Sequence, residues 1–255
     1  MKLLTCALVA GMALASAGSA NAYATLFGED PNNSNQVPLA STLNSDNAQK
    51  AFLAGVTSLG TQNFETLSGG APLTLTFPGA GLGKVTATLS GSSGSVISVT
   101  PGQTDGNGRY SIPSATSSRF WEVSAGPAGN FTVTFDRKIA AFGFYGVDIG
   151  DFGGQLQLQL LSGGDQIGLL TVPNTIGMDG STDGSVLYFG VVAKDAGEFF
   201  DSARFLTTTG VPDGFAFDNF TIADLKQVTP VPEPGSMPLL IGGLLALAST
   251  RRRVS

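Results

Sequence analysis

The chain has 255 residues, 42% of them hydrophobic, which is enough to bury the core of one sizeable domain. Only 13% of the residues are charged, with a formal net charge of −6, and glycine occurs 35 times; this composition favours an exported β protein over a cytosolic helical enzyme. The chain has no histidine and one cysteine, Cys6, so Ser-His-Asp catalysis, Cys-His catalysis and the usual zinc sites are excluded.

Residues 1–22 have the composition of a secretory signal peptide. Lys2 supplies the positive start, an apolar stretch follows, and residues 20–22 form a small-x-small site for signal peptidase. A permanent N-terminal anchor is the alternative, but the apolar run is short. We therefore expect export through the inner membrane and, because Cys6 leaves with the signal, a mature chain without thiols or disulfides.

Residues 23–62 predict a polar loop followed by one short helix. Ser45 is a suitable N-cap, and Ala48 and Phe52 follow at helical spacing. Residues 23–38 are polar and include the loop-forming stretch "DPNNSNQ".

Residues 63–227 predict a β domain. About eleven short runs alternate apolar with polar or small residues, and glycine, proline, serine or asparagine separate them. The runs are 72–77, 84–89, 95–100, 119–124, 130–135, 139–147, 155–161, 166–172, 185–192, 203–208 and 213–222. This pattern predicts an all-β fold, an antiparallel jelly-roll-like β-sandwich with one short N-terminal helix.

A metal site is suggested by "NFETL" (63–67) and "FAFDNFTI" (215–222), in which a carboxylate interrupts aromatic residues. An unpaired charge facing the core is costly. The first and last strands of a jelly roll often lie side by side, so Glu65 and Asp218 could share a calcium ion. The pattern resembles jelly-roll carbohydrate-binding modules, which place a structural calcium between an early Phe-Glu and a late Asp. Alternatively, both side chains face solvent or accept hydrogen bonds from backbone amides.

Asp148 and Asp151 are candidate ligand-binding residues in the loop "DIGDFGG" (148–154). A glycosidase needs two carboxylates that flank a cleft, but the spacing alone does not support catalysis, and an ordinary turn is the alternative. The stretches "MDGSTDG" (178–184) and "DGNG" (105–108) are fragments of calcium-loop patterns that lack the terminal Glu of an EF-hand, so we assign them to hairpin turns.

Aromatic side chains that stack on sugar rings are a second kind of candidate. Trp121 follows Phe120 on a predicted strand, so the two side chains point to opposite faces of the sheet. Tyr145 is a further candidate for a sugar platform. The alternative for a lone Trp in a sandwich is a place in the core.

Residues 228–255 predict a short hydrophobic helix between a Pro-Glu-Pro motif and a basic end. The apolar run of about 17 residues would span roughly 25 Å as a helix, less than the ~30 Å hydrocarbon core of a bilayer. The terminal arginines would stay on the cytoplasmic side by the positive-inside rule. We therefore expect transient insertion into the inner membrane, with a permanent tail anchor as the alternative.

This arrangement resembles the sorting signal of PEP-CTERM proteins. The residues that carry the resemblance are Val231, Pro232, Glu233, Pro234, Arg251, Arg252 and Arg253. The resemblance implies recognition by exosortase, removal of the tail, and delivery to the cell surface or the exopolysaccharide (biofilm) matrix of a Gram-negative bacterium. The stretches 142–154 and 213–222 are also similar to exported PEP-CTERM proteins. Asn219 stands where such endings frequently have a second Asp, which implies weaker cation binding if that position is a ligand.

These features together predict a surface or matrix protein that binds or structures exopolysaccharide and is not an enzyme. Without Lys2 and the three C-terminal arginines, nine basic residues face 19 acidic ones, so nucleic acids are poor partners. The alternatives are a hydrolase that acts on glycans through paired carboxylates and a protein-protein adhesion module.

Overall fold

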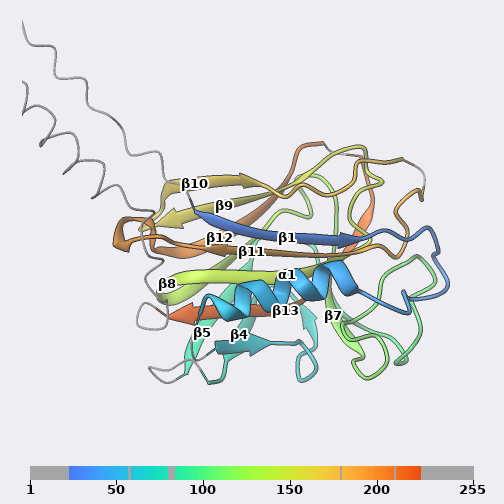
Figure 1. Cartoon of the computed structure of the whole chain (residues 1–255), viewed down its shortest axis with the longest axis horizontal. Coiled ribbons are helices and arrows are strands. Elements are labelled where there is room, and N and C mark those ends of the chain that lie inside the picture. Colours follow the sequence, from blue (N-terminus) through green and yellow to red (C-terminus); the bar gives the residue numbers. More distant parts are fainter. Residues whose placement is uncertain (1–22, 57–58, 80–83, 179, 210, 225–255) are drawn as a thin grey trace, which may run out of the picture.

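The computed structural model describes residues 23–56, 59–79, 84–178, 180–209 and 211–224 (Figure 1). The described strands are β1 (Ala24–Asp30), β2 (Leu59–Gln62), β3 (Gly69–Gly70), β4 (Leu73–Phe77), β5 (Val85–Ser90), β6 (Ser95–Ser98), β7 (Arg119–Ser124), β8 (Phe131–Val147), β9 (Leu156–Ser162), β10 (Asp165–Thr171), β11 (Val186–Val192), β12 (Phe200–Thr207) and β13 (Gly214–Asp224). The described helices are α1 (Leu43–Ala54) and the 3-10 turn η1 (Ala196–Glu198).

The long strand β8 belongs to both layers of the sandwich. Its first part, residues 131–135, pairs with β12 and β5, and its last part, residues 139–147, pairs with β11 and β13. One layer therefore runs β10-β9-β12-β8-β5-β4, and the other runs β1-β11-β8-β13-β7-β6-β3, with β2 beside the end of β13. All these pairs are antiparallel, which confirms the predicted all-β sandwich.

An aromatic core fills the space between the layers. The Phe131 and Phe205 rings stack with centroids 4.3 Å apart, and Phe142, Phe144 and Phe220 surround them at centroid distances of 5.0 to 6.5 Å. Residues 139–147 of β8 are buried without alternation, because their other face lies under α1 and the loops that pack with it. Figure 1 shows α1 lying along this layer.

The start of the chain departs from the prediction in two ways. Residues 24–30 form the strand β1 and pair along their length with β11, where the sequence predicted a loop. Ser45 is not the N-cap of α1: the helix starts earlier, and the Ser45 hydroxyl donates a 2.7 Å hydrogen bond to Asp30. The Asp30 carboxylate also accepts from the amides of Asn44 and Ser45, at 2.9 and 2.8 Å. An acidic side chain from β1 thus satisfies the first turn of the helix.

The described residues contain no helix that is long and apolar enough to cross a membrane. The predicted signal peptide, residues 1–22, and the sorting residues Val231 to Arg253 lie outside the described residues.

Candidate functional site

Loops from five parts of the chain meet at the end of the sandwich where β8 ends and β13 begins. They enclose a hollow of about 330 Å³, open to solvent. The hollow is lined by Asn35, Asn107, Arg109, Asp151, Gly180, Asp183 and Asp213. Its lining is polar, and it combines amides, one guanidinium and several carboxylates.

Asp148 lies directly after β8, on the inner side of this loop cluster. It has a left-handed backbone with φ 65° and is 2% exposed, and its Oδ1 accepts a 3.1 Å hydrogen bond from the Gly184 amide. A Cβ at Gly108 would lie 2.9 Å from this oxygen, so the glycine lets the loop approach the carboxylate. Burial and then the nearby Asp151 charge raise the pKa of Asp148 to about 8.

Asp151 lies at the centre of a group of carboxylates. Asp148, Asp151 and Asp183 each offer a carboxylate oxygen, and these oxygens lie within 4.8 Å of one another. The Asp151 side chain is also within hydrogen-bonding reach of Asp213. Burial and then this contact raise the pKa of Asp213 to about 9, and burial followed by the Asp151 charge raises the pKa of Asp183.

Two oxygens of this group are buried without a partner. Asp151 is 8% exposed, and its Oδ1 has no hydrogen-bond partner; the Oδ2 of Asp213 is likewise buried and unpaired. Buried acceptors are nearly always satisfied in folded proteins. These oxygens can be satisfied in two ways, by a proton shared between Asp151 and Asp213 or by a bound cation.

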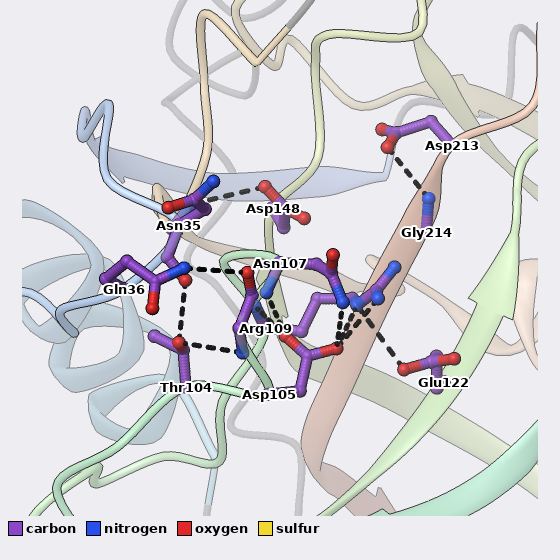
Figure 2. Close-up of polar contacts among 12 residues, drawn as sticks. Asn35, Gln36, Thr104, Asp105, Asn107, Arg109, Glu122, Asp148, Asp213 and Gly214 are labelled. Carbon is purple, nitrogen blue, oxygen red and sulfur yellow. Dashed lines mark hydrogen bonds and ion pairs between the residues drawn. The ribbon is translucent and has the colours of Figure 1, made fainter.

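Arg109 is the one basic residue in the described lining of the hollow, and acidic partners already surround it. Its guanidinium lies 2.7 Å from Asp105 and 3.3 Å from Glu122. Figure 2 draws both contacts. Contacts with Arg109 and the Asn107 amide lower the pKa of Asp105 in spite of its burial. Arg109 is thus held by Asp105 and Glu122 and does not fully offset the crowding of Asp148, Asp151, Asp183 and Asp213, which is why the pKa values of Asp148, Asp183 and Asp213 stay raised.

The rim of the hollow is held by hydrogen bonds between two loops (Figure 2). The Thr104 hydroxyl donates to the Asn35 carbonyl at 2.7 Å, the Gly108 amide donates to the same carbonyl at 3.0 Å, and the Gln36 side chain donates to the Gly106 carbonyl at 3.0 Å. None of these bonds uses the Asn35 side-chain amide. The rim is therefore pre-formed.

The two aromatic residues predicted to be sugar platforms, Trp121 and Tyr145, are buried. Trp121 is 0% exposed and packs against Phe131 in the core, with ring centroids 6.2 Å apart. Tyr145 is 2% exposed and donates a 2.8 Å hydrogen bond to Asp46 of α1. The platform prediction is wrong for both residues: Trp121 faces the core between the layers, and Tyr145 lies on the other face of its layer, which α1 and neighbouring loops cover.

Glu65 and Asp218 are close enough for the Glu65 charge to raise the pKa of Asp218, although burial is the main cause of that shift. The Asp218 carboxylate, 0% exposed, accepts from the Ile112 and Asn219 amides at 2.8 and 2.6 Å. Glu65 lies in a turn after β2, rather than on the expected strand, and accepts from the Ser118 amide and hydroxyl, both at 2.8 Å.

Both carboxylates thus hold the loop between β6 and β7, as the alternative interpretation of these residues expected. Asn219 supports the same loop: its side chain donates a 2.8 Å hydrogen bond to the Ile112 carbonyl. A calcium ion shared by Glu65, Asp218 and Asn219 stays a prediction.

Part of the site is visible in the sequence. Asp148 and Asp151 were candidates from the sequence, and the structure brings them together. The segment that holds Asp183 was assigned to a hairpin turn, which is wrong, because it joins β10 and β11, which do not pair with each other. Asp213 and Arg109 were given no role. The signal for Asp183 was present in "MDGSTDG", whose acidic, glycine-rich composition fits a cation loop.

Comparison with known proteins gives no family. No family model matches the sequence, and no curated protein matches it. In structure the chain is similar to the K2 cleaved adhesin domain of Lys-gingipain, with 16% identity and a TM-score of 0.37 over 65% of this chain and 97% of that one. It is also similar to the enzymatically active domain of tailspike protein 4 of bacteriophage CBA120, with 17% identity and a TM-score of 0.32 over 55% of this chain and 19% of that one. Neither similarity is high enough to assign a function.

Proposed function

We propose that this chain is an exported binding protein that holds a hydroxyl-rich ligand, the exopolysaccharide of the cell surface or matrix, in the hollow at the loop end of the sandwich. The observation that carries the proposal is the pre-formed polar lining, with side-chain amides on Asn35 and Asn107 beside carboxylates on Asp151, Asp183 and Asp213. Amides donate to and accept from sugar hydroxyls, and carboxylates accept from them. The acidic charge of the body favours a neutral glycan over an anionic one.

Delivery to the surface is the second part of the proposal. It rests on the signal-like residues 1–22 and on the resemblance of residues 231–255 to the PEP-CTERM sorting signal, with signal peptidase and exosortase as the processing enzymes. A binding protein with a pre-formed polar hollow would then meet its polysaccharide outside the cell.

A glycan hydrolase is the alternative function that a specific observation favours. Asp148 has a pKa near 8 beside a second carboxylate, and glycosidases pair a raised-pKa acid with an ionised one. Against this, Asp148 is 2% exposed and does not line the open hollow, so a substrate would have to displace loop backbone to reach it.

Affinity electrophoresis of the full chain through gels that contain purified exopolysaccharide tests the proposal. The double variant Asn35→Ala/Asn107→Ala removes two amides from the lining, and with about 0.5–1.5 kcal/mol for each lost hydrogen bond it should bind about tenfold more weakly. The matched control is Gln159→Ala/Gln166→Ala, which removes a pair of amides that hydrogen-bond on β9 and β10.

If the polysaccharide gel retards Asn35→Ala/Asn107→Ala as strongly as the wild type, the hollow is not the binding site. Release of reducing ends from the polysaccharide would instead support the hydrolase.

A further inference from the structure

The carboxylates of Asp148, Asp151 and Asp183 have the spacing of a cation site: Asp151 and Asp183 line the hollow, and Asp148 is buried next to them. Asp148 and Asp151 come from the loop between β8 and β9, and Asp183 from the loop between β10 and β11. One oxygen from each carboxylate lies within 4.8 Å of the others. Oxygens that surround one Ca²⁺ at 2.3–2.6 Å are separated by up to about 5 Å, so a single ion can touch all three.

The unpaired buried oxygens point independently to a ligand. Asp151 is more than nine-tenths buried and lines the hollow, and its Oδ1 accepts no hydrogen bond. The Oδ2 of Asp213, in the same lining, is also buried without a partner. Carboxylates that only happened to lie close together on the surface would have their oxygens solvated by water. These oxygens are instead buried and have no partner.

The positive charge near this group comes from Arg109, which is shared with other carboxylates. Arg109, the basic residue among the described lining residues, is held by Asp105 and Glu122. A cation from solution can therefore supply the positive charge that no described side chain places between Asp148, Asp151 and Asp183.

The donor set selects the kind of cation. All the candidate ligands are carboxylate oxygens, which favour hard cations over zinc or copper. A cluster of three or four carboxylates suits Ca²⁺, which accepts six to eight oxygens in flexible geometry, better than Mg²⁺, which keeps several waters and is usually held by one or two carboxylates. The open volume of about 330 Å³ leaves room for the water or ligand oxygens that would complete the shell.

We infer that Asp148, Asp151 and Asp183 bind one calcium ion, with Asp213 as a fourth carboxylate beside it. The site is distinct from the Glu65 and Asp218 pair, whose oxygens hold backbone amides. It does not depend on the proposed polysaccharide function, and its test uses the metal alone.

Isothermal titration of the full chain, purified in detergent and freed of metal with EDTA, measures the inference directly. We expect one Ca²⁺ per chain, with a dissociation constant in the 10⁻⁴ to 10⁻³ M range of extracellular calcium modules or lower. Mg²⁺ should bind at least about tenfold more weakly. Asp151→Asn and, separately, Asp183→Asn should each weaken calcium binding at least about tenfold. The matched control is Asp165→Asn at an exposed position of β10, which should bind as the wild type does.

Thermal unfolding in EDTA checks that each variant is folded, so that a failed fold is not taken for a lost ligand. Addition of calcium should raise the melting temperature of the wild type and of Asp165→Asn, and should have much less effect on Asp151→Asn. The inference is overturned if the wild type neither binds nor is stabilised at about 10 mM calcium, or if Asp151→Asn and Asp183→Asn bind as tightly as the wild type.

Discussion

Replacement of Asp148 by Asn should make the protein progressively more stable relative to the wild type as the pH rises from 5 to 8, when no metal is present. The carboxyl is 2% exposed, and burial followed by the Asp151 charge raises its pKa from 3.8 to about 8. The folded chain therefore retains a proton that the unfolded chain releases. The stability that this group contributes is complete below about pH 4 and is lost as the pH rises through about 8.

The magnitude follows from the size of the pKa shift. Each pH unit between the unfolded and folded pKa values changes the free energy of unfolding by about 1.4 kcal/mol. Between pH 5 and pH 8 the upper limit is thus about 4 kcal/mol, reduced by whatever solvent reaches the site. Asn has the same shape, and its Oδ1 can still accept from the Gly184 amide, but it does not ionise.

Urea unfolding in EDTA, followed by the fluorescence of the buried Trp121, measures this effect at pH 5, 6, 7 and 8. The free energy of unfolding of Asp148→Asn should gain on that of the wild type by up to about 4 kcal/mol over this range. Asp165→Asn is the control for a general charge effect. A difference between wild type and Asp148→Asn that is the same at pH 5 and pH 8 would refute the reasoning, since it would mean that Asp148 is ionised throughout.

Three further predictions concern the core, the helix and the tail. Phe205→Ala should lower the free energy of unfolding by about 3–5 kcal/mol, because it empties the centre of the aromatic core; a loss below 1 kcal/mol in urea unfolding would contradict that packing. Asp30→Ala should cost about 1–2 kcal/mol, because the first turn of α1 loses its acceptor, whereas Asp165→Ala should cost little. Deletion of residues 231–255 should release the protein to the medium or trap it in the periplasm, which cell fractionation would detect. Unchanged display on the cell surface would contradict the sorting proposal.

Much of the sandwich follows from the sequence because the alternation of side chains is strong. In β9, Leu156, Leu158 and Leu160 face the core while the intervening glutamines are partly exposed, and the pattern alone located this strand. The sequence suggested two strands at 130–135 and 139–147, whereas β8 is continuous. Its polar residues 136–138 mark the place where the pairing partners change, which local periodicity does not encode.

The strand β1 escaped prediction for a different reason. Its residues lack alternation, and its strand character comes from pairing with β11, more than 150 positions later, and from contact with α1. The burial of Trp121 was also ambiguous. Phe120 and Trp121 do point to opposite sides, as expected, but a packed layer covers each side of this sheet.

The candidate site is only partly visible in the sequence because it is assembled from loops. Asp148 and Asp151 stand three residues apart and attract attention together, whereas Arg109, Asp183 and Asp213 join them only when β7, β11 and β13 are placed beside β8 and each other. The topology makes them neighbours, and no local pattern specifies that.

A crystal structure of the protein grown in saturating calcium tests the central claim most directly, because it distinguishes the two calcium positions that the sequence and the structure suggest. Our account predicts one ion about 2.3–2.6 Å from carboxylate oxygens of Asp148, Asp151 and Asp183. An empty hollow, or an ion found only between Glu65 and Asp218, would contradict it.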